Sequence, residues 1–244
     1  MNGKKVRVTK YKDGTWEETE AFVADEISIQ IMANGLLYGT LTCSPWNLEE
    51  LAVGYLCLEG AIHSYADVLT VKTRADQVDV ICRPELQKDP RKDPQEEPDK
   101  EPPAELLASD ITRLMRELEQ RSEIFHQTGG VHNAALSDGK NIITNTEDVS
   151  RHNALNRLVG RCLMQGISLQ NKVIVFSGRV PEEIIQMAAR MRCSAIISVS
   201  APTSKAIEIA QQHDVMLISF ARGEQFNVYT CRDKLSTQPG NRGL

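Results

Sequence analysis

The chain reads KVIVFS (172–177), PEEIIQMAARM (181–191), AIISVS (195–200), TSKAIEIAQQH (203–213) and VMLISFA (215–221) in succession. The three continuous apolar runs are typical of strands that are buried on both faces of a sheet. The two segments between them repeat apolar residues at helical spacing. Strands that alternate with short helices predict an α/β fold, in which a layered sheet contains parallel strands.

The sequence on either side extends this α/β half. Ile111, Leu114 and Leu118 recur at helical spacing, and Asp138-Gly139 is a turn dipeptide between two strand-like runs. The expected elements are a helix over 109–127, two strands within 128–149, a helix over 151–165 and a last short strand over 226–230.

The N-terminal part reads as a small α+β unit. Ile27, Ile29 and Ile31 alternate with polar residues, and Asn34-Gly35 is a hairpin turn signal. Apolar residues at helical spacing follow Pro45 and Asn47. The expected elements are a strand over 6–11, strands within 20–44, a helix over 48–62 and a strand over 76–84.

One change of composition divides the chain. Residues 88–103 read KDPRKDPQEEPDKEPP, and six of the ten prolines lie between Pro84 and Pro103. Such a segment has little apolar surface to bury, so we expect it to be solvated, extended and mobile. The predicted organisation is an N-terminal α+β domain (1–87), a linker (88–103) and a C-terminal domain (104–244).

Composition and charge exclude several classes of protein. Apolar residues make up 41% and charged residues 25% of the chain, which is ordinary for a globular protein. A net charge of -5 argues against non-specific nucleic-acid binding. No apolar run is long enough to span a membrane, and the charged N-terminus is not followed by a signal-peptide core. We therefore expect a cytoplasmic protein that binds neither membrane nor nucleic acid.

Small or polar residues follow the predicted strands, just before each helix. In open α/β sheets, ligands lie at the carboxyl ends of strands, where helix N-termini offer N–H groups to anions. Ordinary helix capping uses the same residue types, but five such loops at one sheet edge favour a nucleotide-like ligand. The candidate ligand-binding residues are Thr128, Gly129, Gly130, His132, Arg151, His152, Asn153, Ser177, Gly178, Arg179, Ser200 and Thr203.

Neither the histidines nor the cysteines predict a metal site. His132 and His152 lie in these polar loops, but the spacing supplies no further set of metal ligands, so contact with an anion or a ribose is the better interpretation. The six cysteines are dispersed, and none forms a C-x-x-C pair. We expect no zinc.

Taken together, these segments resemble the formate dehydrogenase accessory sulfurtransferase family. The matching stretches are LTCSPWNLEELAVGYLCLEGAI, IFHQTGGVHNAAL, EDVSRHNALNRLVG, VIVFSGRVPEEIIQMA, SAPTSKAIEIA and FARGEQFNVYT, in the family's order. The resemblance implies a C-terminal three-layer domain similar to cytidine deaminase. Arg151-His152-Asn153 and Ser177-Gly178-Arg179 stand where a deaminase has its zinc ligands and glutamate, so deaminase chemistry is rejected.

The resemblance also implies a function. Members of the family are thought to take persulfide sulfur from a cysteine desulfurase and deliver it to the molybdenum cofactor of the formate dehydrogenase catalytic subunit. That cofactor is Mo-bis(molybdopterin guanine dinucleotide), and the family is usually homodimeric. The family's cofactor-contact stretch maps to Phe220, Ala221, Arg222, Gly223, Glu224 and Gln225.

The sequence departs from the family at the sulfur-carrying cysteines. The family's C-G-x-C-G loop is replaced here by RPELQKDPRKDPQEEPDKEPPAELL, which contains no cysteine. Two functions stay open. In the first, the chain is a sulfurtransferase that uses another thiol, for which Cys82 is the first candidate and Cys231 the second. In the second, it is a non-catalytic chaperone that binds the cofactor.

Overall fold

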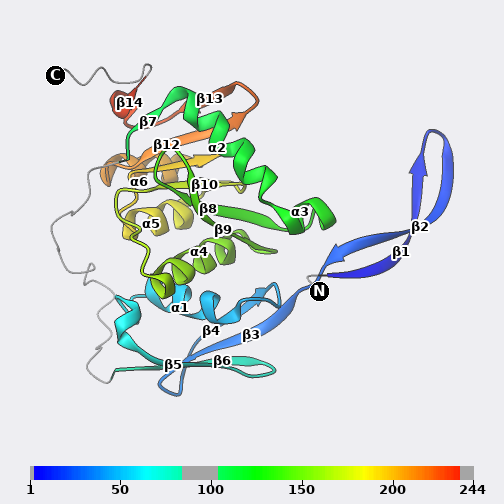
Figure 1. The fold of residues 1–244 in the computed structure, drawn as a ribbon, viewed down its shortest axis with the longest axis horizontal. Helices are drawn as coiled ribbons and strands as arrows, with labels where there is room; N and C mark the ends of the chain where they lie inside the picture. Colours follow the sequence, from blue (N-terminus) through cyan, green and yellow to red (C-terminus); the bar gives the residue numbers. More distant parts are fainter. Residues whose placement is uncertain (1–2, 84–103, 237–244) are drawn as a thin grey trace.

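The computed structural model describes residues 3–83 and 104–236, and it forms a layered molecule with one projecting arm (Figure 1). The predicted linker over residues 88–103 lies outside these ranges, so its mobility stays a prediction.

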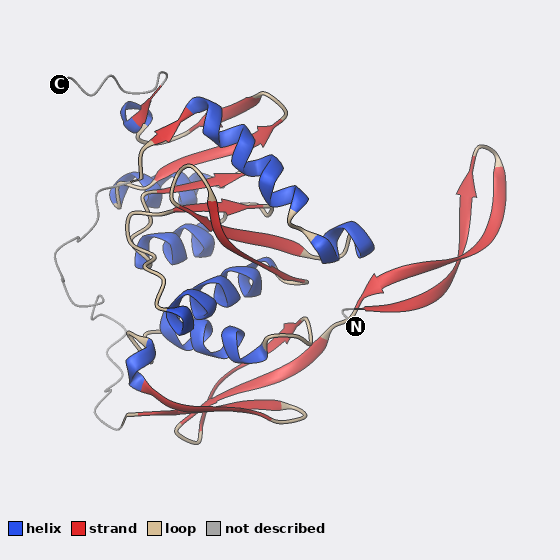
Figure 2. Ribbon diagram, viewed as in Figure 1, coloured by secondary structure: helices blue, strands red, loops and turns tan. Residues whose placement is uncertain are grey.

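A six-stranded mixed sheet forms the centre of the C-terminal half (Figure 2). Its strand order is β13-β12-β11-β10-β8-β9, in which β10, β11 and β12 are parallel and the other strands pair antiparallel to their neighbours. The strands are β8 (His132–Ser137), β9 (Ile142–Asp148), β10 (Val173–Phe176), β11 (Ala195–Ser198), β12 (Met216–Arg222) and β13 (Gln225–Val228). The predicted α/β fold with parallel strands is confirmed.

Helices cover both faces of this sheet and give three layers. Ile174 and Phe176 pack with α4 (Arg151–Gln165), α5 (Glu182–Arg190) and α6 (Ser204–Gln212). Val173 and Val175 point to the other face, where they pack with α2 (Ala108–Gln120). Alternate residues of one strand thus belong to two separate cores, which explains why the strand is apolar throughout. The specific likeness to cytidine deaminase stays a prediction.

The helix predicted over residues 109–127 is two helices. The first is α2, and the second is α3 (Glu123–Thr128). The break occurs at Ser122, whose Oγ donates to Leu118 O at 2.6 Å. The Glu147 carboxylate accepts hydrogen bonds from Ile124 N and Phe125 N, and so supports the new helix start. A partner distant in sequence therefore sets the break.

The N-terminal unit is a four-stranded sheet of order β4-β3-β6-β5, covered by α1 (Leu48–Leu58). The helix is shorter than the predicted range 48–62, and Gly60 with φ 73° follows its end. The strand β5 was not predicted. The remaining elements of this unit are β3 (Ile27–Ala33), β4 (Leu36–Cys43), η1 (Tyr65–Asp67), β5 (Val68–Thr73) and β6 (Gln77–Cys82).

A two-stranded arm precedes this unit and projects from the body of the protein (Figure 1). It consists of β1 (Gly3–Lys12) and β2 (Thr15–Ala24), which pair antiparallel over their whole length. The turn is Asp13-Gly14, and both residues have positive φ. The sequence predicted the strand at 6–11 but not the hairpin.

The two units meet where α1 crosses α4. Gly54 and Gly160 lie at the crossing, and a Cβ at either position would overlap the backbone of the opposite helix. Glycine is therefore required at both positions by the close approach of the helices. Two short strands, β7 (Leu106–Leu107) and β14 (Leu235–Ser236), and the turn η2 (Arg232–Lys234) complete the described fold. None of the helices in residues 3–83 and 104–236 is long and apolar enough to cross a membrane.

Candidate functional site

The five polar loops lie at one edge of the six-stranded sheet. Four of them follow β9, β10, β11 and β12, and the fifth precedes β8, which runs antiparallel to β10. A cavity of about 620 Å³ opens at this edge, between the strand ends and the helices α2 and α3. Its wall consists of Thr112, Met115, Arg116, Leu118, Glu119, Ser122, Phe125, Gly129, Gly130, Val131, His132, Asn133, Val149, Ser177, Val199, Ala221, Arg222 and Gly223.

Some of the predicted ligand-binding residues lie on this wall and others do not. Those on the wall are Gly129, Gly130, His132, Ser177, Ala221, Arg222 and Gly223. Those outside it are Thr128, Arg151, His152, Asn153, Gly178, Arg179, Ser200, Thr203, Phe220, Glu224 and Gln225.

Several of the residues off the wall make structural contacts, and Thr128 is one of them, because its Oγ1 donates to Ile124 O at 2.8 Å and accepts from Gly130 N at 3.0 Å. Thr203 caps α6, because its Oγ1 accepts from Ala206 N at 3.2 Å. Asn153 Nδ2 donates to Thr42 O at 2.9 Å and so links α4 to the N-terminal unit.

One wall of the cavity was missed by the sequence analysis. The helix α2 contributes Thr112, Met115, Arg116 and Glu119, which follow the i, i+3, i+4, i+7 spacing of a single helix face. This spacing was readable from the sequence, but it describes a core-facing helix equally well. Asn133, which directly follows the predicted residue His132, was also missed.

The end of β12 has a distorted backbone that shapes the cavity. Phe220 adopts φ 54°, which is uncommon for a residue with a large side chain, and its ring is exposed. The register between β12 and β13 shifts between Ser219 and Arg222. Such a bulge re-aims side chains at a strand end. Here it leaves Phe220 outside and places Ala221 and Arg222 on the cavity wall.

Asn133 and Ser177 connect β8 to the loop after β10. Asn133 N donates to Ser177 Oγ at 2.8 Å, and Ser177 N donates to Asn133 O at 3.0 Å. Asn133 is 3% exposed and lines the cavity, and its Oδ1 has no hydrogen-bond partner among residues 3–83 and 104–236. A buried polar atom without a hydrogen-bond partner is uncommon in proteins, so each one requires a physical explanation.

A positive charge beside the cavity comes from Arg151 rather than from the histidines. Burial and the neighbouring Arg151 guanidinium lower the pKa of both His132 and His152. The imidazoles are therefore neutral near pH 7 and can both donate and accept hydrogen bonds. Arg151 Nε is buried and has no hydrogen-bond partner within the described part of the chain.

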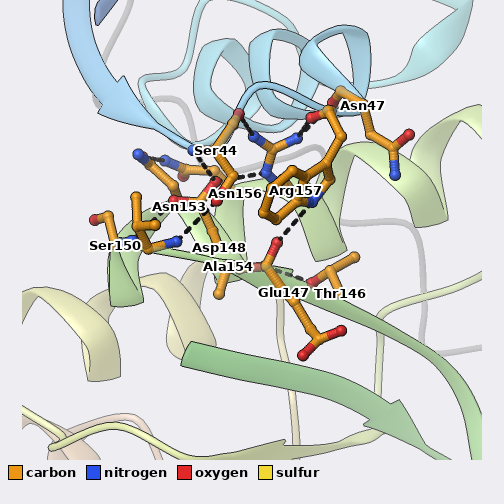
Figure 3. Close-up of polar contacts among 12 residues, drawn as sticks. Ser44, Asn47, Thr146, Glu147, Asp148, Ser150, Asn153, Ala154, Asn156 and Arg157 are labelled. Carbon is orange, nitrogen blue, oxygen red and sulfur yellow. Dashed lines mark hydrogen bonds and ion pairs between the residues drawn. The ribbon is translucent and has the colours of Figure 1, made fainter. Parts of the chain in front are cut away.

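Two consecutive acidic residues at the end of β9 hold the surroundings of the cavity in place (Figure 3). Glu147 supports the start of α3, as described above. Asp148 accepts hydrogen bonds from Ser44 N, Ser150 N and Arg157 Nε. Arg157 in turn donates to the backbone oxygens of Ser44, Trp46 and Asn47. The loop after β4 is thereby tied to the start of α4.

The candidate sulfur carriers differ in burial. Cys82 is 5% exposed on β6, and burial together with the nearby Asp67 raises the pKa of its thiol. Cys231 is half-buried, and burial and its hydrogen bond to Asp214 raise its pKa. Burial raises the pKa of Cys43 and of Cys162 to about 12 and that of Cys57 to about 11. Burial also raises the pKa of Cys193. In this conformation the environment favours the protonated thiol at all six positions.

No metal centre is visible in the described part of the chain. Among residues 3–83 and 104–236, no group of three or more His, Cys, Asp or Glu side chains is placed to hold a metal ion.

Comparisons with known proteins point to one family. The sequence model of the FdhD/NarQ family matches residues 24–236. The chain is 35% identical over 251 residues to the sulfur carrier protein FdhD of Bacillus licheniformis, covering 94% of this chain and 95% of that protein. It is 34% identical over 250 residues to the protein of the same name from Bacillus subtilis, covering 93% and 95%.

A solved structure shares the fold. The crystal structure of a protein assigned as a formate dehydrogenase accessory protein from Desulfotalea psychrophila superposes with a TM-score of 0.81. The match covers 97% of this chain and 100% of that chain, at 22% sequence identity.

Proposed function

Because the chain belongs to the FdhD/NarQ family, we propose that it is a formate dehydrogenase accessory protein that binds Mo-bis(molybdopterin guanine dinucleotide) and supports its sulfuration. The family resemblance inferred from the sequence is confirmed by this match. The proposed partners are a cysteine desulfurase, the catalytic subunit of formate dehydrogenase and a second copy of the chain.

The cavity at the sheet edge carries the proposal. Its volume of about 620 Å³ is in the range of small-molecule sites and suits one guanine nucleotide arm of the cofactor. Gly129 and Gly223 have open space where a side chain would stand, so a ligand can approach their backbone closely. The unpartnered Oδ1 of Asn133 adds a buried polar group on the same wall. These residues fit a nucleotide.

Different residues of the cavity would bind the base and the phosphates of the nucleotide. Met115, Leu118 and Val199 supply an apolar surface for the base. The Arg222 guanidinium supplies charge and paired donors for phosphate. When bound, the cofactor supplies the molybdenum centre that receives sulfur. The chain's own residues hold and orient the nucleotide arm.

Calorimetric titration with GDP tests this proposal. We expect GDP to bind, the affinity to fall as salt rises, and Arg222→Ala to weaken binding about tenfold, because a charge-assisted contact is lost. Arg121→Ala is the matched control, since it removes an exposed guanidinium that does not line the cavity. Wild-type protein that binds neither GDP nor the purified cofactor contradicts the proposal.

The absence of the family's cysteine loop and the raised pKa values of the thiols favour a second candidate function. The family's C-G-x-C-G loop is absent, and the pKa values of all six thiols are raised. We therefore keep the alternative of a non-catalytic chaperone that binds the cofactor. Mass spectrometry after incubation with a cysteine desulfurase and cysteine separates the two functions. A gain of about 32 Da, one sulfur atom as a persulfide, supports the carrier. Retention of cofactor binding without this adduct supports the chaperone.

A further inference from the structure

The hairpin of residues 3–24 leaves the body of the protein as an arm (Figure 1). At its base, β2 contacts α3, and a Cβ on Gly130 would lie 3.2 Å from the Cβ of Ala24. At its tip, Tyr11 and Trp16 are 60% and 72% exposed, and their rings lie 4.9 Å apart. An isolated two-stranded hairpin is only marginally stable in water, and three or more strands are needed for independent stability. The outer part of the arm therefore has little packing of its own.

Charge is divided between the two strands of the arm. Five of the ten residues of β1 are basic and none is acidic, whereas β2 contains three glutamates and no basic residue. Lys5 Nζ lies 3.2 Å from Glu20 Oε2, and both side chains are exposed. Arg7 and Lys12 make no ion pair with any residue of 3–83 or 104–236. Their charges are available to another molecule.

The register of the hairpin assigns each side chain to one of two faces. Residues that lie opposite each other in an antiparallel pair point to the same face. One face, which we call the aromatic face, consists of the pairs Gly3–Ala24, Lys5–Phe22, Arg7–Glu20, Thr9–Glu18 and Tyr11–Trp16. Its basic residues all come from β1, and its acidic residues all come from β2.

This division makes the aromatic face complementary to itself. Consider a second copy that is rotated by half a turn about the long axis of the arm and laid against the aromatic face. Its β2 then lies over β1 of the first copy, at the same level along the arm. Arg7 of each arm faces Glu20 of the other, and Tyr11 of each arm faces Trp16 of the other. Two-fold contacts of this kind are the commonest in homo-oligomers.

Pairing of two arms through their edges does not give this complementarity. A two-fold axis would place β1 beside β1 or β2 beside β2, so that like charges lie opposite each other, which is destabilising. Charged side chains on exposed edge strands commonly prevent such pairing. The charge pattern therefore favours contact through a face of the arm rather than through its edges.

We propose that the arms of two copies pack against each other through their aromatic faces and form a two-layered contact of four strands. This inference rests on the proposed function, which includes a second copy among the partners, and it assigns the surface through which that copy binds. The aromatic face comprises ten residues. A standard interface uses about 20–30 residues a side, so we expect a reversible dimer rather than an obligate one.

Sedimentation velocity of the full chain at increasing protein concentration tests the contact. We expect the wild type to shift from monomer to dimer. Trp16→Ser and Arg7→Glu should each weaken the dimer about tenfold or more, because the first removes aromatic surface and the second places like charges opposite each other. Lys12→Glu is the matched control, since it changes the net charge equally but lies on the opposite face of the arm. It should dimerise as the wild type does.

A charge exchange between copies gives a sharper test. Arg7→Glu and Glu20→Arg each place like charges opposite each other in their own dimers, so each variant should be monomeric where the wild type is dimeric. A mixture of the two variants should form a heterodimer, because every charge then faces an opposite charge. Recovery of the dimer in the mixture also shows that both variants keep a folded arm.

The outcomes are distinct from those of the proposed function. A wild type that stays monomeric at every concentration overturns the inference. A dimer that Trp16→Ser and Arg7→Glu leave unchanged also overturns it, as does an equal loss of dimer in Lys12→Glu. Two monomeric variants that form no heterodimer when mixed overturn the contact of Arg7 with Glu20. GDP titration of the same proteins reports separately on the proposed function, whatever their oligomeric state.

Discussion

The Asp148 carboxylate lies 2.7 Å from Arg157 Nε, and both side chains are almost fully excluded from water (Figure 3). Each of the two also bonds to the loop after β4: Asp148 accepts from Ser44 N, and Arg157 donates to three backbone oxygens of residues 44–47. The pair therefore joins the N-terminal unit to the edge of the sheet where the cavity lies.

Removal of one partner should be strongly destabilising. We expect Arg157→Leu to lower the free energy of unfolding by about 3–5 kcal/mol, because Asp148 is left buried without its counter-charge. Urea denaturation measures this change. Glu208→Ala breaks the exposed Lys205 pair and is expected to cost less than about 1 kcal/mol. Equal effects of the two substitutions would show that burial does not determine the contribution of these pairs.

The helix crossing gives a second prediction. We expect Gly160→Ala to destabilise the protein by about 3 kcal/mol or more, because its Cβ overlaps the backbone oxygen of Glu50 and separates α1 from α4. Thermal unfolding detects the effect. The control is Gln165→Ala, an exposed position at the end of the same helix, where a stability near that of the wild type is expected. A wild-type melting temperature for Gly160→Ala would contradict the close approach.

Histidine titration gives a third prediction. The pKa values of His132 and His152 are lowered in the folded protein, so between these values and the ordinary 6.5 the unfolded chain binds more protons. The free energy of unfolding should therefore fall as pH drops below about 6.5. Denaturation curves from pH 8 to 5 measure the slope. The double variant His132→Gln/His152→Gln should flatten this slope. A wild-type slope in the double variant would assign the pH dependence to other groups.

The reactivity of the cysteine thiols gives a fourth prediction. Because Cys231 is more exposed than Cys82 or Cys193, iodoacetamide should modify Cys231 before either of them in the folded protein. All rates should rise as pH increases above 8, since the raised pKa values keep the thiols protonated at neutral pH. Peptide mapping after timed quenching ranks the sites. Cys82 reacting first would instead reveal opening of β6 and would favour Cys82 as the sulfur carrier.

Local sequence patterns were sufficient to predict the strands of the central sheet but not every element of the fold. The runs at 172–177 and 195–200 are apolar on both faces, so their strands follow directly from the pattern. The break at Ser122 was not readable, because it depends on the Glu147 carboxylate from a strand more than twenty residues away. The strand β5 was missed because its mostly exposed residues give little periodicity.

In the candidate site, too, residues with a local sequence signal were predicted, and residues that depend on distant contacts were not. Gly129, Ser177 and Arg222 lie in loops next to predicted strands. Ligands of α/β sheets bind at the carboxyl ends of strands, and this rule predicted that the three residues lie close together. Arg116 and Met115 lie inside a helix whose pattern resembles an ordinary core-facing helix. Only the packing of α2 beside the strand ends shows that this face borders a cavity. The contact of Asn153 with Thr42 also depends on the approach of the two units, which neither local sequence describes.

The long sequence separation within the Asp148–Arg157 network has a consequence for biosynthesis. Arg157 follows Trp46 by 111 residues. At roughly 5–20 residues per second, the ribosome finishes the loop at 44–47 about 5–20 s before it adds the guanidinium that fixes that loop. During this interval the nascent N-terminal unit lacks α4, and the face of α1 that contains Gly54 has no helix against it. A ribosome stalled before residue 157 would therefore display an unfinished apolar surface, which is the kind that chaperones bind.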